Sequence, residues 1–200
     1  MSTPKQTPPA KLLIQMSGAP GSGKSTVARL LRPCIGGVIV DHDVLRSSLL
    51  ESAIIPFDDA AKQAYLLQWK LAKDFMMNQG LSVITDSTCN YPEVLEQGTA
   101  LAVQHGYAYW YVECKVGDVD LLDKRLRARP AMASQRSAVD CPPAAAQGNG
   151  IRVDEDARAL FAKWIDSPCR PNDDHVITFD STGSPEMLCE QILKKIFSTS

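Results

Sequence analysis

The sequence predicts an α/β domain in which helices cover both faces of a parallel sheet. Short apolar runs alternate along the chain with longer segments whose apolar residues recur every three or four positions, a pattern typical of repeated strand–helix–strand units. A glycine-rich segment, residues 18–26, separates the first apolar run from the first helical pattern. A chain of 200 residues has the length of one ordinary domain with a sizeable core.

Five short apolar runs predict the strands of this sheet. The first run is Leu12-Leu13-Ile14 with Met16, and the second and third runs end at the acidic residues Asp41 and Asp86. The expected strands cover residues 12–16, 38–40, 81–86, 107–112 and 176–179.

Helical spacing and stop signals place helices between these strands. Apolar residues from Val27 to Leu31 recur at helical spacing, and Pro33 is expected to end that helix. A second helix is expected from Val44 to the break at Pro56. The remaining expected helices cover residues 58–79, 92–104, 118–127, 154–165 and, from residue 184 or 185, the segment to 197.

Residues 130–153 interrupt the alternation with prolines, glycines and three consecutive alanines. Loops of this length inside a compact domain are usually either functional lids or disordered segments. We therefore expect a single domain over residues 11–200 with a lid or insert at about 129–153. Residues 1–10, which are polar and rich in proline, are expected to form a flexible leader.

The charge balance disfavours a nucleic-acid partner. The net charge is −2 and both signs are interspersed, whereas a duplex-binding protein needs a basic stripe. Basic residues do gather in residues 121–140, which fits one phosphate-rich ligand better than a polymer.

Other classes of partner have little support. The six cysteines are scattered without C-x-x-C spacing, so we expect free thiols in a reducing compartment and no zinc site. No apolar run has the length of a signal-peptide core or of a membrane span. A cytoplasmic protein is therefore expected, and nothing in the sequence indicates an oligomeric state.

The segment Gly18-Ala19-Pro20-Gly21-Ser22-Gly23-Lys24-Ser25-Thr26 matches the phosphate-binding pattern G-x-x-x-x-G-K-[ST], with a strand before it and a helix after it. Glycines allow successive backbone N–H groups to point inward, where the helix N-terminus adds partial positive charge. Lys24 is expected to reach the β- and γ-phosphates, and the Ser25 hydroxyl to bind Mg²⁺. The expected nucleotide contacts are Ala19, Gly21, Ser22, Gly23, Lys24, Ser25 and Thr26.

The carboxyl ends of the strands should gather the other candidate residues, because ligands of parallel sheets bind at that edge. A carboxylate after the second strand can orient an attacking hydroxyl and accept its proton. We favour Asp43 over Asp41, because Asp43 shares a helical face with Arg46. The alternatives are that Asp43 merely caps the following helix and that Arg46, our candidate for binding the acceptor, forms a surface ion pair.

Asp86 ends the third strand and is followed by Ser87 and Thr88, without the glutamate that activates water in motor-type ATPases. Asp86 could help to hold Mg²⁺ through water or steady Arg46 beside the substrate; its alternative is a turn residue.

Basic and aromatic pairs supply further candidates. Arg125 and Arg129 lie four residues apart on one helical face, and Arg129 is the better candidate for stabilising charge on the transferred phosphate. Arg125 could stack on the adenine or pair with a phosphate, and Arg136 could contact the substrate. For Tyr65 and Trp69 we favour core packing over a substrate wall.

The sequence lacks the N-K-x-D motif with which GTPases bind guanine. The D-x-x-G match at residues 180–183 follows the last strand, so it is more plausibly a loop bordering adenine.

In their order along the chain, these motifs resemble the small P-loop kinases of the polynucleotide kinase-like group, which also includes gluconate kinases and zeta-toxin kinases. The matching pieces are the segment 18–26, Asp43-x-x-Arg46, Ile84 to Thr88 with Asn90, and Arg125-Leu126-x-x-Arg129. The resemblance implies a three-layer P-loop NTPase fold with a five-stranded sheet of order 2-3-1-4-5. It also implies ATP and Mg²⁺, with Asp43 as base, Arg46 as acceptor contact and Arg129 as lid arginine.

Two features differ from polynucleotide kinases: no basic channel is evident, and the segment after Arg129 is longer than a simple lid. We therefore expect an ATP-dependent kinase that phosphorylates a hydroxyl of a small molecule. The alternatives are a 5′-hydroxyl nucleic-acid kinase and a non-catalytic ATP-binding module.

Overall fold

The computed structural model describes residues 11–52, 55–146, 156–172 and 174–198. The expected leader, residues 1–10, and the end of the expected lid, residues 147–153, lie outside these ranges. So does the expected start of a helix at Asp154.

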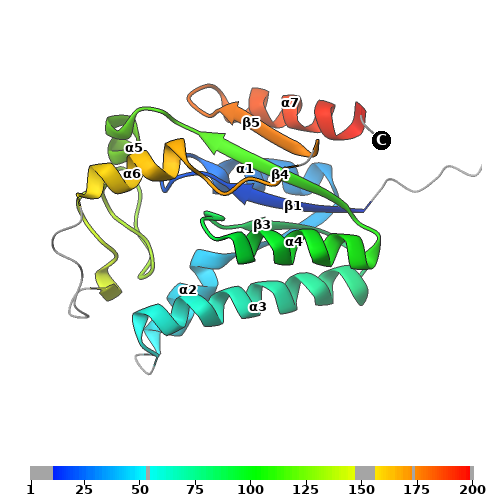
Figure 1. Ribbon diagram of the computed structural model, residues 1–200, viewed down its shortest axis with the longest axis horizontal. Helices are drawn as coiled ribbons and strands as arrows, with labels where there is room; N and C mark the ends of the chain where they lie inside the picture. The colour runs from blue at the N-terminus through cyan, green and yellow to red at the C-terminus, as the bar shows by residue number, and fades with distance from the viewer. Residues whose placement is uncertain (1–10, 53–54, 147–155, 173, 199–200) are drawn as a thin grey trace, which may run out of the picture.

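The five expected strands form one parallel sheet of order β2-β3-β1-β4-β5, which confirms the predicted topology (Figure 1). The strands are β1 (Leu12–Ser17), β2 (Gly37–Asp41), β3 (Ser82–Asp86), β4 (Ala108–Lys115) and β5 (Val176–Asp180). Asp41 and Asp86 are direct partners in the register of β2 and β3. The two acidic strand ends therefore lie side by side at the carboxyl edge of the sheet.

Helices cover both faces of the sheet, as expected for parallel strands. They are α1 (Lys24–Cys34), α2 (His42–Glu51), α3 (Phe57–Met77), α4 (Pro92–His105), α5 (Val119–Arg127), α6 (Ala157–Asp166) and α7 (Pro185–Ser198), with a short 3₁₀ turn at Ala144–Ala146. Helices α1 and α7 cover one face, and α3 and α4 cover the other (Figure 1).

Alternate residues of the central strand β1 explain the two faces. Leu12, Ile14 and Met16 pack with α1 and α7, whereas Leu13 packs with α3 and α4. A smaller apolar cluster joins α5 and α6 through Leu122 and Phe161. That cluster fixes these two helices beyond the carboxyl edge of the sheet, where they frame a cavity.

Several element boundaries differ by one or more residues from the sequence-based expectation, and two of these differences have a clear physical reason. Pro33 lies inside the last turn of α1, where a missing N–H removes a single backbone hydrogen bond. Strand β4 extends to Lys115 rather than ending at Val112. It includes the buried Glu113, whose carboxylate is held by the Arg170 guanidinium. An ion pair that neutralises the carboxylate allows a charged residue to continue an otherwise apolar strand.

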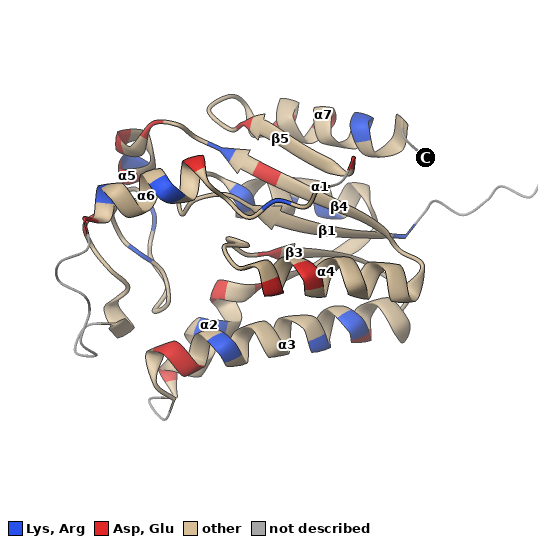
Figure 2. Ribbon diagram, in the orientation of Figure 1, with Lys and Arg blue, Asp and Glu red and all other residues tan. Residues whose placement is uncertain are grey.

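Charged side chains of both signs are spread over the helices (Figure 2). None of the helices in the described ranges combines the length and the apolar character needed to cross a bilayer.

Candidate active site

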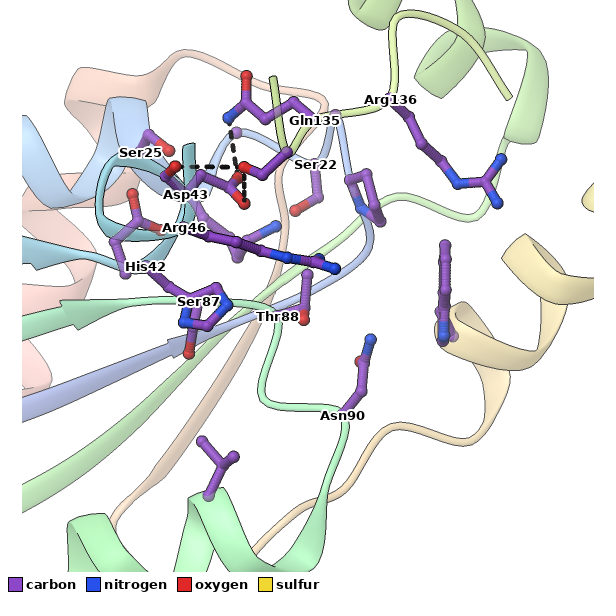
Figure 3. A pocket seen from close by; sticks show the side chains of 18 of the residues that line it. Ser22, Ser25, His42, Asp43, Arg46, Ser87, Thr88, Asn90, Gln135 and Arg136 are labelled. Atoms are coloured by element: carbon purple, nitrogen blue, oxygen red, sulfur yellow. Dashed lines mark hydrogen bonds between the residues drawn. The ribbon is translucent and has the colours of Figure 1, made fainter. Parts of the chain in front are cut away.

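A cavity of ≈ 1710 Å³ lies beyond the carboxyl ends of the strands. Its walls come from the glycine-rich loop, the first turns of α2 and α3, the β3–α4 connection, residues 134–136 and α6 (Figure 3). It collects every site residue expected from the sequence except Ala19, whose side chain is buried beneath the loop. The expected residues on the cavity wall are Gly21, Ser22, Gly23, Lys24, Ser25, Thr26, Asp43, Arg46, Asp86, Arg125, Arg129 and Arg136.

The glycine-rich loop has a backbone that side chains would obstruct. Gly18, Gly21 and Gly23 have φ values of 130°, 86° and 98°, in the region that favours glycine. A Cβ atom at Gly18 would also lie 2.3 Å from the carbonyl oxygen of Cys114. The loop therefore keeps its curled form, with backbone N–H groups available to a phosphate.

Lys24 opens α1 and folds back over this loop. Its Nζ donates to the carbonyl oxygens of Gly18 at 2.9 Å and Ala19 at 3.0 Å. Burial lowers the pKa of Lys24 from its ordinary value, while the charges of Asp86 and Asp43 act in the opposite direction. A bound phosphate would add negative charge beside this buried ammonium and so stabilise its charged form.

Ser25 and Asp86 supply oxygen atoms suited to a divalent cation. Asp86 is 4% exposed, and its Oδ2 has no hydrogen-bond partner. Burial, with the charge of Asp41, raises the pKa of Asp86 to about 6, against the opposing effects of Lys24 and the Ser25 hydroxyl. An unpartnered carboxylate oxygen near a hydroxyl fits the oxygen ligands of Mg²⁺, which takes few protein ligands and keeps water or phosphate for the rest.

Asp41, not Asp43, caps helix α2. Its Oδ1 accepts from the backbone N–H groups of Asp43 at 2.9 Å and Val44 at 3.4 Å. Asp41 is therefore occupied as an N-cap and does not line the cavity, whereas Asp43 does.

The Asp43 carboxylate is held by the lid segment (Figure 3). Its Oδ2 accepts from Gln135 Nε2 at 2.8 Å and its Oδ1 from Ser134 Oγ at 3.3 Å. Ser134 is itself buried against α2, where the hydroxyl of Ser47 donates to Ser134 Oγ at 2.9 Å. Among the described residues, no lysine or arginine forms an ion pair with Asp43.

Arg46 crosses the cavity beside Asp43 and Thr88 (Figure 3). Its guanidinium lies 3.9 Å from the ring centre of Phe57 and donates from Nη2 to the Phe57 carbonyl oxygen at 3.1 Å. Its buried Nε has no partner. Within the described ranges Arg46 forms no ion pair, so it is not the surface salt bridge considered as its alternative.

The three other arginines expected at the site occupy different walls of the cavity. Arg125 bridges the glycine-rich loop and the last strand, because its Nη2 donates to Ser181 O at 3.0 Å and its Nη1 contacts Gly21 O at 3.5 Å. Arg129 lines the cavity with a buried Nε that lacks a partner. Arg136 donates to Val139 O at 3.0 Å, and its guanidinium lies 5.9 Å from the Trp164 ring.

Several lining residues carried little usable signal in the sequence. Trp164 lies far from the motifs along the chain, and Ser134 and Gln135 had only a weak signal as neighbours of Arg136 in the expected lid; the fold brings all three to the cavity. Tyr65 was expected in the core, yet it also lines the cavity and stacks on His42, with ring centres 3.9 Å apart. Trp69 packs in the core as expected.

The sequence matches the AAA domain family over residues 13–147. Because that match covers more than half of the chain, the protein belongs to this family of P-loop kinases. No curated protein sequence matches the chain significantly.

Solved structures share the kinase-like P-loop fold. A candidate kinase from Chloroflexus aurantiacus is 16% identical, with a TM-score of 0.69 over 96% of this chain and 98% of that one. The APS kinase of Mycobacterium tuberculosis, in complex with AMPPNP and APS, is 18% identical, with a TM-score of 0.60 over 95% and 99%. A gluconokinase from Sinorhizobium meliloti is 12% identical, with a TM-score of 0.56 over 96% and 98%. At these identities, the likeness establishes the fold alone.

Proposed function

We propose that this protein is an ATP-dependent phosphotransferase that moves the γ-phosphate to a hydroxyl of a small molecule. The observation that carries the proposal is the pairing of two features in one cavity: a phosphate-binding loop with Lys24, and the Asp43 carboxylate. The names of the solved relatives, which include APS kinase, a sugar kinase and gluconokinase, agree with a small acceptor.

In this proposal the loop between Gly18 and Lys24 binds the phosphates of ATP through backbone N–H groups, and Arg125 borders the adenine side. Ser25 and Asp86 would hold Mg²⁺, whose charge, when bound, offsets that of the phosphates. Lys24 and Arg129 stabilise the charge that develops on the transferred group.

Asp43 orients the acceptor hydroxyl and takes its proton as the oxygen attacks the γ-phosphorus. The bond from that phosphorus to the β–γ bridging oxygen breaks, and ADP leaves with the electron pair. Because Gln135 and Ser134 hold Asp43 through single hydrogen bonds, each carboxylate oxygen keeps a lone pair for this proton. The segment of about 129–153 acts as the lid, by our proposal, with residues 11–200 as one domain behind a leader of residues 1–10.

The substitution Asp43→Asn tests the proposal. We expect phosphate transfer to fall by about 10²- to 10⁴-fold, the range of a lost general base, while AMPPNP binding stays within about threefold, roughly 0.6 kcal/mol. ADP release from Mg-ATP would be measured without acceptor, with pooled hydroxylated metabolites, and with a 5′-hydroxyl oligonucleotide. Stimulation by the metabolite pool supports the proposal.

The same assay separates the two alternatives. Stimulation by the oligonucleotide alone, with salt-sensitive binding, would identify a nucleic-acid kinase. AMPPNP binding with no stimulation by any acceptor would indicate a nucleotide-binding module. We place the protein in the cytoplasm, since all six cysteines are free thiols, as in a reducing compartment.

A further inference from the structure

The part of the cavity beyond Asp43 is lined by aromatic rings. Phe57, Tyr65, Tyr91 and Trp164 are the phenylalanine, tyrosine and tryptophan side chains among the described lining residues. They come from α3, the β3–α4 connection and α6, and none comes from the wall formed by the glycine-rich loop. The aromatic surface therefore faces the acceptor and not the nucleotide.

Two of these rings, Tyr65 and Tyr91, meet nearly at right angles and form an uncharged corner of the cavity wall. Tyr65 stacks on His42 with an angle of 30° between the rings, and Tyr91 meets Tyr65 edge-on at 6.4 Å. Burial lowers the pKa of His42 to about 4, so its imidazole is neutral at neutral pH. Tyr91 is 58% exposed at the cavity wall, where a bound ring could cover it.

The cavity also has an excess of positive charge. Eight lysine and arginine side chains line it, against four aspartates and glutamates, although the whole chain has a net charge of −2. ATP offsets part of this excess, but Mg²⁺ bound to its phosphates removes part of that offset. Positive charge therefore remains for a second anionic ligand.

Arg46 is the cation best placed to bind that anion. It points into the space that Asn90 faces from the β3–α4 connection (Figure 3). One N–H of its guanidinium is used by the Phe57 carbonyl oxygen, and the buried Nε has no partner among the residues that the structure describes. A guanidinium with free donors on an aromatic ring is suited to a carboxylate or a phosphate.

The size of the cavity also indicates room for a second ligand beside ATP. A cavity of ≈ 1710 Å³ exceeds the roughly 300–1,000 Å³ of an ordinary ligand site. After ATP is bound, enough space remains for an acceptor much larger than a simple sugar.

We propose that the acceptor is a hydroxylated ring compound that carries an anionic group, with its ring against Tyr65 and Tyr91 and its anion on Arg46. This inference rests on the proposed kinase function and specifies its substrate class. A nucleotide and an acidic aromatic glycoside share the required chemistry.

A binding experiment can separate ring from charge. The full-length chain, saturated with Mg²⁺ and AMPPNP, would be titrated with phenyl β-D-glucuronide, phenyl β-D-glucoside, glucuronate and glucose. These four probes combine the presence or absence of a ring with the presence or absence of a carboxylate. We expect the carboxylate and the ring each to tighten binding by about tenfold. Adenosine 5′-phosphate and adenosine, as a second pair, distinguish a nucleotide acceptor from a glycoside.

Two variants assign these gains to residues. Arg46→Gln should remove the gain from the carboxylate and keep the gain from the ring, and Tyr91→Ala should do the reverse. The matched controls are Arg32→Gln, which removes an exposed arginine outside the cavity, and Phe197→Ala, which removes an exposed ring on α7. Both controls should bind every probe as the wild type does.

Equal binding of glucose and phenyl glucuronide would overturn the inference, and so would failure of all six probes to bind at millimolar concentration. In a parallel assay with Mg-ATP in place of AMPPNP, binding of the anionic ring probes without any ADP release would contradict the kinase function but support the ligand class. Rapid phosphate transfer to a neutral acceptor without a ring would support the kinase function but overturn the inferred ligand class.

Discussion

The two halves of the cavity are built in different ways. In the proposed function, the core of the nucleotide half comes from one continuous segment, Gly18 to Thr26, and Asp86, Arg125 and Arg129 are added at its border. The acceptor half takes side chains from α2, α3, the β3–α4 connection, the lid segment and α6. Phosphate recognition is thus local in the chain, whereas acceptor recognition depends on the packing of distant elements.

This difference has a consequence for specificity. A curled backbone with positive φ values at three glycines leaves little freedom to change the nucleotide half. Side chains such as Tyr91 and Arg136 lie on helix ends and loops, where substitution costs less. The acceptor half can therefore diverge on a constant scaffold.

The largest effect is expected in the nucleotide half. Lys24→Met should lower ATP turnover by about 10³-fold, because the Lys24 ammonium lies over the loop, where it can stabilise a developing phosphate charge. Steady-state ADP release would measure it. Lys70→Met, which changes an exposed lysine of α3 outside the cavity, is the control. Turnover within about twofold of the wild type, roughly 0.4 kcal/mol, would show that the loop does not work as proposed.

The second-largest effect is expected for Asp86, which lies where the nucleotide half and the acceptor half of the cavity meet, and it concerns the pH dependence of stability. Burial raises the pKa of Asp86 to about 6 from the model-compound value of 3.8, so between these pH values the folded chain binds more protons than the unfolded chain. The free energy of unfolding should therefore fall by about 2 kcal/mol as pH rises from 4 to 6.5.

Asp86→Asn should lack this fall, since its side chain does not ionise. Urea unfolding at several pH values would compare the two proteins, with Asp166→Asn as a control that changes an exposed carboxylate of α6. Parallel pH curves for the wild type and Asp86→Asn would contradict the assigned cause.

A smaller effect is expected for the contact of the lid segment with Asp43. Gln135→Ala removes the hydrogen bond to Asp43 Oδ2, so transfer to an acceptor should fall by about tenfold through poorer orientation. AMPPNP binding should stay unchanged. Gln63→Ala, an exposed position on α3 outside the cavity, is the matched control. A loss of AMPPNP affinity equal to the loss of turnover would mean that Gln135 serves the nucleotide half.

The smallest effect separates the two neighbouring aspartates. Asp41→Ala should cost about 1 kcal/mol of unfolding free energy, because the N-cap of α2 is lost, and should leave turnover close to that of the wild type. Asp41→Asn should retain most of the stability, since asparagine also caps helices. Thermal unfolding and ADP release on the same samples would check both. If turnover is lost in both variants, Asp41 would be the better candidate for the base.

The sequence predicted the order of elements well, because apolar periodicity and glycine or proline breaks act locally. It placed Asp43 and Arg46 on one helical face, and the structure puts both on the cavity wall. It could not separate the roles of Asp41 and Asp43, since Asp41 ends β2 and Asp43 lies two residues later. The hydrogen bonds of Asp41 to the first turn of α2 make that distinction.

Several residues of the acceptor half could not be predicted, because their place depends on how distant segments pack together. Gln135 and Trp164 have no pattern along the chain, and their place depends on how α5 and α6 pack through Leu122 and Phe161. Tyr65 has the helical spacing of a core residue, and only the fold brings it beside His42 and onto the cavity wall.

The sequence by itself determined the phosphate-binding loop, the parallel sheet and the acidic ends of two strands, because each depends on residues close together in the chain. Tertiary structure alone decided which of the two carboxylates near the end of β2 faces the cavity. It also brought Gln135 to Asp43 and grouped the aromatic rings opposite the loop. Those features arise from contacts between segments up to 92 residues apart, which local spacing does not encode.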